Sequence, residues 1–273
     1  MVCRLKIFFM LRNRTIEVFD FVQPFALVMA IVCVSAVSAV ASEEVGKAVA
    51  IVPAVKGAGG ALDVGSPIHR DERIVSSKSG LGQFKFRDGT KLAVGPNSSV
   101  VIDSFVFDDS NSIKKLTLNA TKGTFRWISG SSKSSAYKIT TPLGTLGVRG
   151  TAFDVYVGSK IAAVLLLRGE LRFCGNNGGC KNLTRRCGIL IANSTGVMGN
   201  GRESQSKNAV PGVPNELSFP FSTGSKTLTK PFRVGGHKCF GVIEFNERQP
   251  DESQDSSGPG GGSGSGENPN GPN

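Results

Sequence analysis

Gln83-Phe84-Lys85-Phe86-Arg87, Asp88-Gly89 and Lys91-Leu92-Ala93-Val94 are the segments that decide the fold class of this chain. In the first segment the phenylalanines share one face and the charged residues the other, which is the period of a half-buried strand. Asp88-Gly89 is typical of a two-residue hairpin turn, in which glycine takes a positive φ. Alternation resumes after it, so the sequence predicts two antiparallel strands joined by a tight hairpin.

The same alternation continues along the chain. It recurs at Leu116 and Leu118, in Thr124–Trp127 and in Phe153–Val157, and Ala162–Leu167 is a continuous apolar run suited to a strand buried on both faces. Turn signals recur about every 8–12 residues, and no amphipathic helix pattern is present. The sequence therefore predicts an all-β fold, either an antiparallel β-sandwich or a short β-solenoid-like module.

The N-terminal segment predicts export. Residues 1–24 carry four basic and two acidic residues, and an uncharged apolar stretch follows as far as Ala41. It ends in small residues at positions 39 and 41, which suit signal peptidase, so we expect a signal peptide over 1–41 cleaved between Ala41 and Ser42. The alternative is an uncleaved membrane anchor. Both place residues 42–273 outside the cytoplasm.

Composition divides the exported part into three. We expect a β domain over 42–200, a β-rich extension over 201–249 with several phenylalanines, and a disordered acidic tail rich in Gly, Ser and Pro over 250–273. Residues 42–249 hold 28 basic and 15 acidic residues, a net charge of +13. Export and the lack of aromatic residues between the basic ones argue against a nucleic-acid ligand.

Four cysteines remain after cleavage: Cys174, Cys180, Cys187 and Cys239. In an oxidising compartment they allow three disulfide pairings. The Gly/Asn-rich loop between the first two suggests a closed hairpin, which leaves the other two to join the extension to the body; pairing of Cys174 with Cys239 is the alternative. The spacings do not suit zinc, the chain has only 2 histidines, and we expect neither a metal nor a cofactor.

Several segments, in their order, resemble the FecR domain, an exported β-rich module named after a regulator of iron-citrate transport. They are Val64-Gly65-Ser66, Asp71-Glu72-Arg73-Ile74, Phe86–Leu92, Gly95-Pro96-Asn97-Ser98, Val101–Phe105, Lys122–Arg126, Thr141–Thr151 and Arg168-Gly169-Glu170. The resemblance implies a regulator built of a cytoplasmic anti-sigma region, one membrane span and this exported domain. Only 24 residues precede the apolar stretch here, too few for a folded anti-sigma region.

Turn and structural roles are expected for the residues of the matching motifs: Asp88, Gly89, Gly95, Pro96, Gly123, Arg126, Thr141, Pro142, Arg149, Gly150 and Thr151. We expect a positive φ at Gly95 and a place on the solvent face for Arg126. Arg149 is expected to bind loop carbonyls or to pair with Asp88 or Asp103, and the alternative is contact with a carboxylate or phosphate of a ligand.

No catalytic residue is predicted. Ser135-Ala136-Tyr137-Lys138 matches the Ser-x-x-Lys pattern of serine acylases, which requires both side chains on one face of a helix. The string leads into a predicted strand, so we expect Ser135 and Lys138 to face opposite sides.

The resemblance and the basic body together predict a non-enzymatic, exported binding module of the bacterial cell envelope, in the periplasm or outside the cell, with envelope signalling as a role. The expected partner is an envelope protein or an anionic cell-wall polymer, and membrane contact is expected only through an uncleaved N-terminus. The alternatives are a membrane-anchored signalling regulator and an envelope polysaccharide hydrolase.

Overall fold

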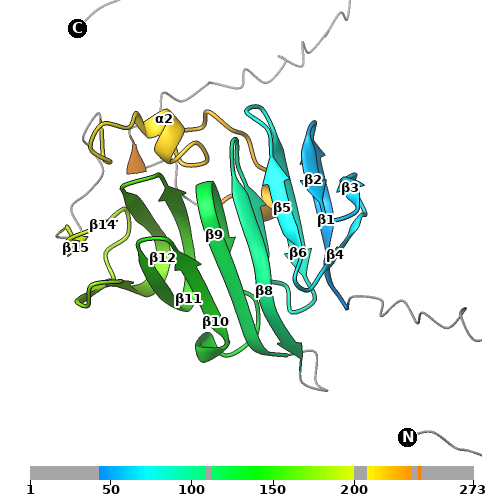
Figure 1. Cartoon of the computed structure of the whole chain (residues 1–273), viewed down its shortest axis with the longest axis horizontal. Coiled ribbons are helices and arrows are strands. Elements are labelled where there is room, and N and C mark those ends of the chain that lie inside the picture. The colour runs from blue at the N-terminus through cyan, green and yellow to red at the C-terminus, as the bar shows by residue number, and fades with distance from the viewer. Residues whose placement is uncertain (1–42, 108–111, 200–207, 235–238, 241–273) are drawn as a thin grey trace, which may run out of the picture.

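The computed structural model describes residues 43–107, 112–199, 208–234 and 239–240. The predicted signal peptide with its cleavage site between Ala41 and Ser42, and the predicted tail over 250–273, lie outside the described residues. Within the described ranges fifteen strands form one connected sheet, accompanied by three short helical segments (Figure 1). The all-β prediction is confirmed.

The strands are β1 (Glu44–Val52), β2 (Val55–Gly57), β3 (Gly60–Ala61), β4 (Pro67–His69), β5 (Arg73–Ser76), β6 (Leu81–Phe86), β7 (Lys91–Val94), β8 (Ser99–Phe107), β9 (Ile113–Ile128), β10 (Tyr137–Thr141), β11 (Gly144–Val157), β12 (Ala162–Gly175), β13 (Cys180–Leu183), β14 (Ile189–Asn193) and β15 (Gly196–Met198). The helical segments are the 3-10 turns η1 (Ser134–Ala136) and η2 (Lys230–Phe232) and the helix α2 (Asn215–Ser218).

The two halves of β9 have different partners. Residues 113–122 pair with β8, and residues 116–119 pair with β10 on the other side. Residues 123–128 pair with β11, and residues 125–128 pair with β7. The β9–β10 ladder is parallel, whereas the other ladders among the described strands are antiparallel. The sheet is therefore mixed, which the sequence patterns did not predict.

Three glycines lie where long strands of this sheet change partners or register. Gly123 has a φ of 101° where β9 changes partners, and a Cβ there would collide with Ser98. Gly150 in β11 and Gly169 in β12 also have positive φ, of 59° and 81°, beside a register shift between these strands. Residues with side chains rarely adopt this conformation, and irregular registers bend strands. These glycines let one sheet fold over a shared core.

The main core lies on the inner face of the folded-over sheet. Phe84 of β6 and Trp127 of the second half of β9 belong to the same buried cluster as Ile102 of β8 and Leu118 of the first half of β9. Residues of both halves of β9, together with β7 and β10, line one internal cavity of about 10 Å³. The side chains that alternate with these core residues point to the outer face of the sheet. On β6, β7, β9, β11 and β12 they are buried as well, because the extension covers them.

The β6–β7 hairpin differs in detail from the prediction. The amide of Gly89 donates to the carbonyl oxygen of Phe86 (3.0 Å), and the amide of Phe86 donates to the carbonyl oxygen of Thr90 (2.8 Å). Gly89 has a φ of 82°. This is the geometry of a three-residue loop with glycine in the left-handed position rather than of a two-residue turn.

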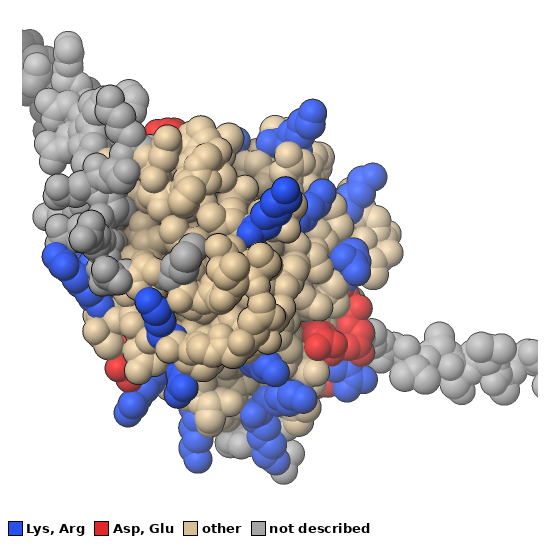
Figure 2. Space-filling view, turned by 60° about the vertical axis from the view of Figure 1, so that its left-hand side comes forward, with Lys and Arg blue, Asp and Glu red and all other residues tan. Residues whose placement is uncertain are grey.

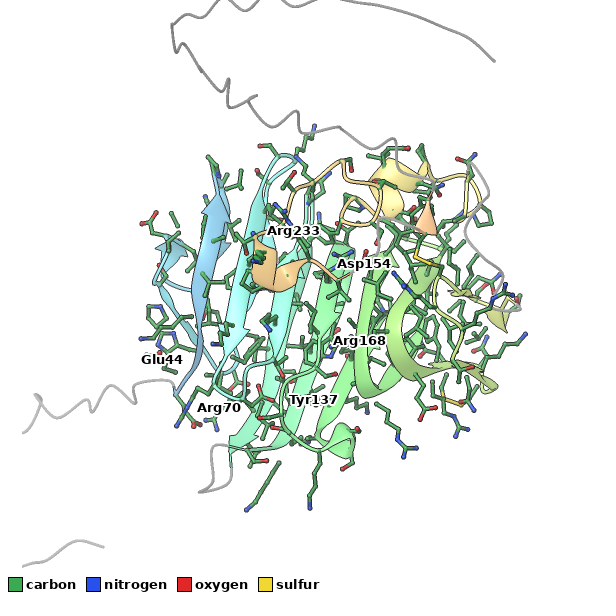
Figure 3. The ribbon with its side chains drawn as sticks, turned by 180° about the vertical axis from the view of Figure 1, so that it is seen from behind. Glu44, Arg70, Tyr137, Asp154, Arg168 and Arg233 are labelled. Carbon is green, nitrogen blue, oxygen red and sulfur yellow. A yellow bond between two sulfur atoms is a disulfide. The ribbon has the colours of Figure 1, made fainter. Side chains whose placement is uncertain are left out.

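The prediction of a β-rich extension over 201–249 is wrong for its described part. Residues 208–234 and 239–240 contain α2, η2 and one isolated bridge between Val210 and Val213. Four prolines, at positions 211, 214, 220 and 231, interrupt this stretch, and proline cannot donate to a strand ladder. Phe219, Phe221 and Phe232 are buried separately against the outer face of the sheet. Figure 3 shows this face from behind, with η2 across the strands.

Candidate functional site: a basic groove over Gly147

A groove of about 520 Å³ crosses the outer surface of β10, β11, β12 and β13. Its middle is one row of residues in register: Lys138 lies opposite Gly147, Gly147 opposite Arg172, and Arg172 opposite Asn182. All four are exposed, and their neighbours along β10, β11 and β12 are buried. We call this the Gly147 groove.

Gly147 forms the floor because it has no side chain. A Cβ at this position would meet nothing within 4 Å. Adjacent strands lie about 4.8 Å apart, so the backbones of Lys138 and Arg172, two strands apart, are separated by about 10 Å. The result is a gap with a cation on each side.

Arg149 lies at one end of the same groove, paired with Glu170. Its Nη1 atom is 3.2 Å from Oε1 of Glu170, and the two side chains are 78% and 46% exposed. The expected pairing with Asp88 or Asp103 is therefore wrong, because strand alternation places Arg149 on the outer surface of β11 beside β12. An exposed pair of this kind contributes about 0–1 kcal/mol, so it holds the guanidinium only weakly.

The groove is positively charged. Lys138, Arg149 and Arg172 face one acidic residue, Glu170, which Arg149 already contacts. No ion pair joins Lys138 or Arg172 to another residue within the described ranges. On the face of the molecule seen in Figure 2, Lys and Arg side chains outnumber acidic ones. Guanidinium and ammonium groups bind carboxylates and phosphates by charge-assisted hydrogen bonds.

Ser135 and Lys138 line this groove together, so the expectation that they face opposite sides is wrong. Ser135 lies in the 3-10 turn η1 and Lys138 in β10, where the chain changes direction between them. Among the hydrogen bonds of the described residues none joins the two. The arrangement lacks the helical turn that the serine acylase chemistry requires.

A buried carboxylate fixes the groove from below. The hydroxyl of Tyr137, the first residue of β10, donates to Oδ2 of Asp88 (2.5 Å), and Oδ1 of Asp88 accepts from the amide of Thr90 (2.9 Å). Burial raises the pKa of the Tyr137 phenol above its ordinary value, and the hydrogen bond to Asp88 raises it further. Asp88 therefore ties the β6–β7 hairpin to the start of β10, which is more than the turn role that the sequence predicted.

Arg126 lies on the outer face of β9, beneath the extension, and is buried, so the expectation of a solvent-facing side chain is wrong. Its Nε and Nη2 atoms donate to the two oxygens of Asp154 (2.6 and 2.7 Å), and both residues are at most 2% exposed. Ser222 of the extension completes the cluster, donating to Asp154 (2.6 Å) and accepting from Arg126 (2.9 Å). The ring of Phe221 lies 5.6 Å from the guanidinium carbon. The alternation correctly placed Arg126 opposite Trp127, but the sequence did not show that the extension covers that face.

Two disulfides are present, with the pairing expected from the sequence. Cys174–Cys180 joins directly opposed residues of β12 and β13 and so secures the strand that carries Asn182. Cys187–Cys239 joins the loop before β14 to the extension.

The remaining motif residues have structural positions. Gly95 does not have a positive φ, contrary to expectation; a Cβ there would collide with Thr124 Oγ1 and lie 2.9 Å from Phe221. Pro96 accepts a hydrogen bond from Ser98 Oγ (3.0 Å) within the β7–β8 turn.

Thr141 and Pro142 form the tight β10–β11 turn. Thr141 Oγ1 donates to the carbonyl oxygen of Gly144 (3.0 Å), and Asn176 donates to the carbonyl oxygen of Pro142 (2.7 Å). Thr151 is fully buried, and its carbonyl oxygen accepts from the amide of Ser129 (2.9 Å).

The sequence missed Lys138, Gly147 and Arg172 as a group. The alternation in Thr145–Arg149 places positions 147 and 149 on one surface, but the register with β10 and β12 is a property of the folded sheet. In the part of the chain that the structure describes, no three His, Cys, Asp or Glu side chains gather to form a metal site. Nor is any helix among the described residues long and apolar enough to cross a membrane.

Comparisons with known proteins give one family. The family model described as FecR protein matches residues 72–172, which run from β5 through most of β12. No curated protein matches the chain.

Two crystal structures of a candidate anti-sigma factor from Parabacteroides distasonis are similar, with TM-scores of 0.40 and 0.38 and 14% sequence identity. Each match covers 49% of this chain and 61% of the other. The family match spans the motifs that resembled this domain in the sequence from Glu72 onward, leaving out Val64-Gly65-Ser66 and Asp71, and it includes β10, β11 and most of β12, which carry the Gly147 groove. Residues 72–172 of this chain therefore match the FecR domain.

Proposed function

We propose that this protein is a non-enzymatic, exported binding module of the bacterial cell envelope, acting in envelope signalling, and that the Gly147 groove binds an anionic group of its partner. The partner is an envelope protein or an anionic cell-wall polymer. The observation that carries the proposal is the row of Lys138, bare Gly147 and Arg172 across three strands.

Three features support this assignment. The FecR match over residues 72–172 supports a role related to envelope signalling. Two disulfides suit an oxidising compartment outside the cytoplasm. The groove supplies three cations with a single acidic residue among them, and a rigid sheet holds their backbones in place.

Filling the groove tests the binding site. Gly147→Phe introduces a ring where the floor is open, and an exposed strand position tolerates an aromatic residue. We expect binding of polyglutamate and of polyphosphate to fall at least tenfold, while the far-UV circular dichroism spectrum and the unfolding midpoint are unchanged. Val106→Phe on β8, at a position 44% exposed, is the matched control and should bind as the wild type does. Equal binding by Gly147→Phe and Val106→Phe would refute the groove.

The two probes also separate the possible partners. Preference for polyglutamate supports an acidic protein segment, and preference for polyphosphate supports a phosphate-bearing wall polymer. N-terminal sequencing of the protein from cell envelopes tests export: a chain that begins at Ser42 supports the proposal, and an intact N-terminus supports the membrane-anchored alternative.

A further inference from the structure

A second groove lies where the extension meets the turns of the sheet. Its volume is about 730 Å³, within the range of small-molecule sites, and it is lined from both parts of the chain. The body contributes Lys78 of the β5–β6 loop, Lys122 of β9 and Tyr156 of β11, and the extension contributes Leu217 and Lys226. We call it the seam groove. It shares no lining residue with the Gly147 groove.

The apolar side of the seam groove comes from α2, a helix that buries polar residues and exposes a leucine. In α2 the polar residues Asn215 and Ser218 are buried, and Leu217 is 65% exposed. The buried groups are bonded: Oδ1 of Asn215 accepts from the amide of Ala209 (2.8 Å), and Ser218 Oγ donates to the carbonyl oxygen of Pro214 (3.1 Å). These bonds fix the helix with its leucine turned outward, where it lines the groove.

The other side of the seam groove is cationic. Lys78 and Lys122 are exposed and Lys226 is half-buried. None of the three forms an ion pair with another described residue. One acidic residue, Glu216, also lines the groove, so the lining has an excess of two positive charges. Lysine stems also cover apolar surface while the ammonium remains in water.

The extension, which supplies one side of the seam groove, is fixed to the body by covalent and polar contacts. The extension is joined to the body by Cys187–Cys239 and by the cluster of Arg126, Asp154 and Ser222. Because Leu217 and Lys226 belong to the extension and lie beyond the FecR match at 72–172, this groove exists only through the combination of the two parts.

We propose that the seam groove binds an amphipathic anion, a small molecule with an apolar chain or ring and a carboxylate or phosphate head. The chain contacts Leu217 and the ring of Tyr156, and the head lies among the three lysines. Burial of apolar surface supplies most of the affinity, and the lysines select against uncharged molecules of the same shape. This site is independent of the proposed function of the Gly147 groove.

The test uses the full chain and three probes of equal length: dodecanoate, dodecyl phosphate and dodecanol, each below its aggregation concentration, with binding measured by calorimetry. We expect both anions to bind at least fivefold more tightly than dodecanol. If only one anion does so, the head group of the natural ligand is identified as carboxylate or phosphate. Binding of no probe, or equal binding of all three, would overturn the proposal.

Paired variants locate the site. Leu217→Ser should weaken all three probes by about tenfold, because it removes most of a leucine side chain from the contact. Val64→Ser, at a position 67% exposed, is the matched control and should weaken none. Lys122→Gln with Lys226→Gln should weaken both anions by about threefold for each lysine and leave dodecanol unchanged.

Lys114→Gln with Lys115→Gln, two exposed lysines of β9 outside the seam groove, should change nothing. Gly147→Phe should also bind the probes as the wild type does, which separates this site from the Gly147 groove. Anion binding that survives Leu217→Ser in a folded protein would refute the site.

Discussion

Arg126 of β9 and Asp154 of β11 form a two-bonded ion pair inside the protein, and the extension seals it from solvent through Ser222. The pair lies between directly opposed residues of neighbouring strands. The extension is thus anchored by a polar contact as well as by its phenylalanines, and in Figure 3 the labelled Asp154 is on the face that the extension crosses.

Removing one member of this pair should destabilise the protein strongly. Asp154→Asn leaves the guanidinium buried without a counter-charge, and loss of a buried partner costs about 3–5 kcal/mol. The free energy of unfolding from urea titration measures it. Glu170→Gln, which breaks the exposed pair with Arg149, is the control and should cost less than about 1 kcal/mol. Similar losses in both variants would contradict the role assigned to Asp154.

Alkaline pH should destabilise the protein through Tyr137. Burial and the bond to Asp88 raise the pKa of Tyr137 in the folded state above 10.0, so folding favours the protonated phenol. This contribution is complete below pH 10.0 and is lost as pH rises from there through the folded-state pKa. Tyr137→Phe should lower stability at neutral pH by about 1–3 kcal/mol, since Asp88 loses a donor.

The pH dependence distinguishes this effect from a loss of packing. The free energy of unfolding of Tyr137→Phe should fall less steeply above pH 10.0 than that of the wild type. Parallel curves for the two proteins would show that the phenol does not titrate as predicted.

Alanine substitution at two glycines of the sheet should affect the stability of the protein to very different extents. Gly123→Ala places a Cβ against Ser98 at a φ of 101° and should cost at least about 2 kcal/mol. Gly147→Ala adds a methyl group into open space and should change stability by less than about 0.5 kcal/mol. Thermal unfolding measures both, and a stable Gly123→Ala protein would refute the role of Gly123 in folding the sheet over.

The two disulfides should differ in their effect on stability. Loop-closure entropy predicts a contribution of roughly 4 kcal/mol for Cys187–Cys239, with a sequence separation of 52, and roughly 2 kcal/mol for Cys174–Cys180, with a separation of 6. Replacing each pair by serine and comparing the free energies of unfolding without reductant gives the order. The reverse order would show that the extension contributes little to the cooperative unit.

Local patterns determined the strands of the body correctly in kind. Alternation at Gln83–Arg87 and Thr124–Trp127 predicted β6 and the second half of β9, because strand periodicity is set by the backbone itself. The motifs also identified the FecR domain. The same pattern wrongly predicted strands in the extension, because its alternating phenylalanines pack against a face of the sheet and do not belong to a strand ladder.

The sequence by itself determined the all-β class, the FecR motifs, the basic charge and a cysteine set able to staple the extension. Only the tertiary structure decided which charges meet. Arg126 is buried because a segment nearly a hundred residues later covers it, and Arg149 pairs with Glu170 because of the β11–β12 register. Likewise, Lys138, Gly147 and Arg172 become one row only when three strands align. Strand period is a local property of the chain, whereas register and coverage depend on contacts between distant segments, which no single stretch of sequence encodes.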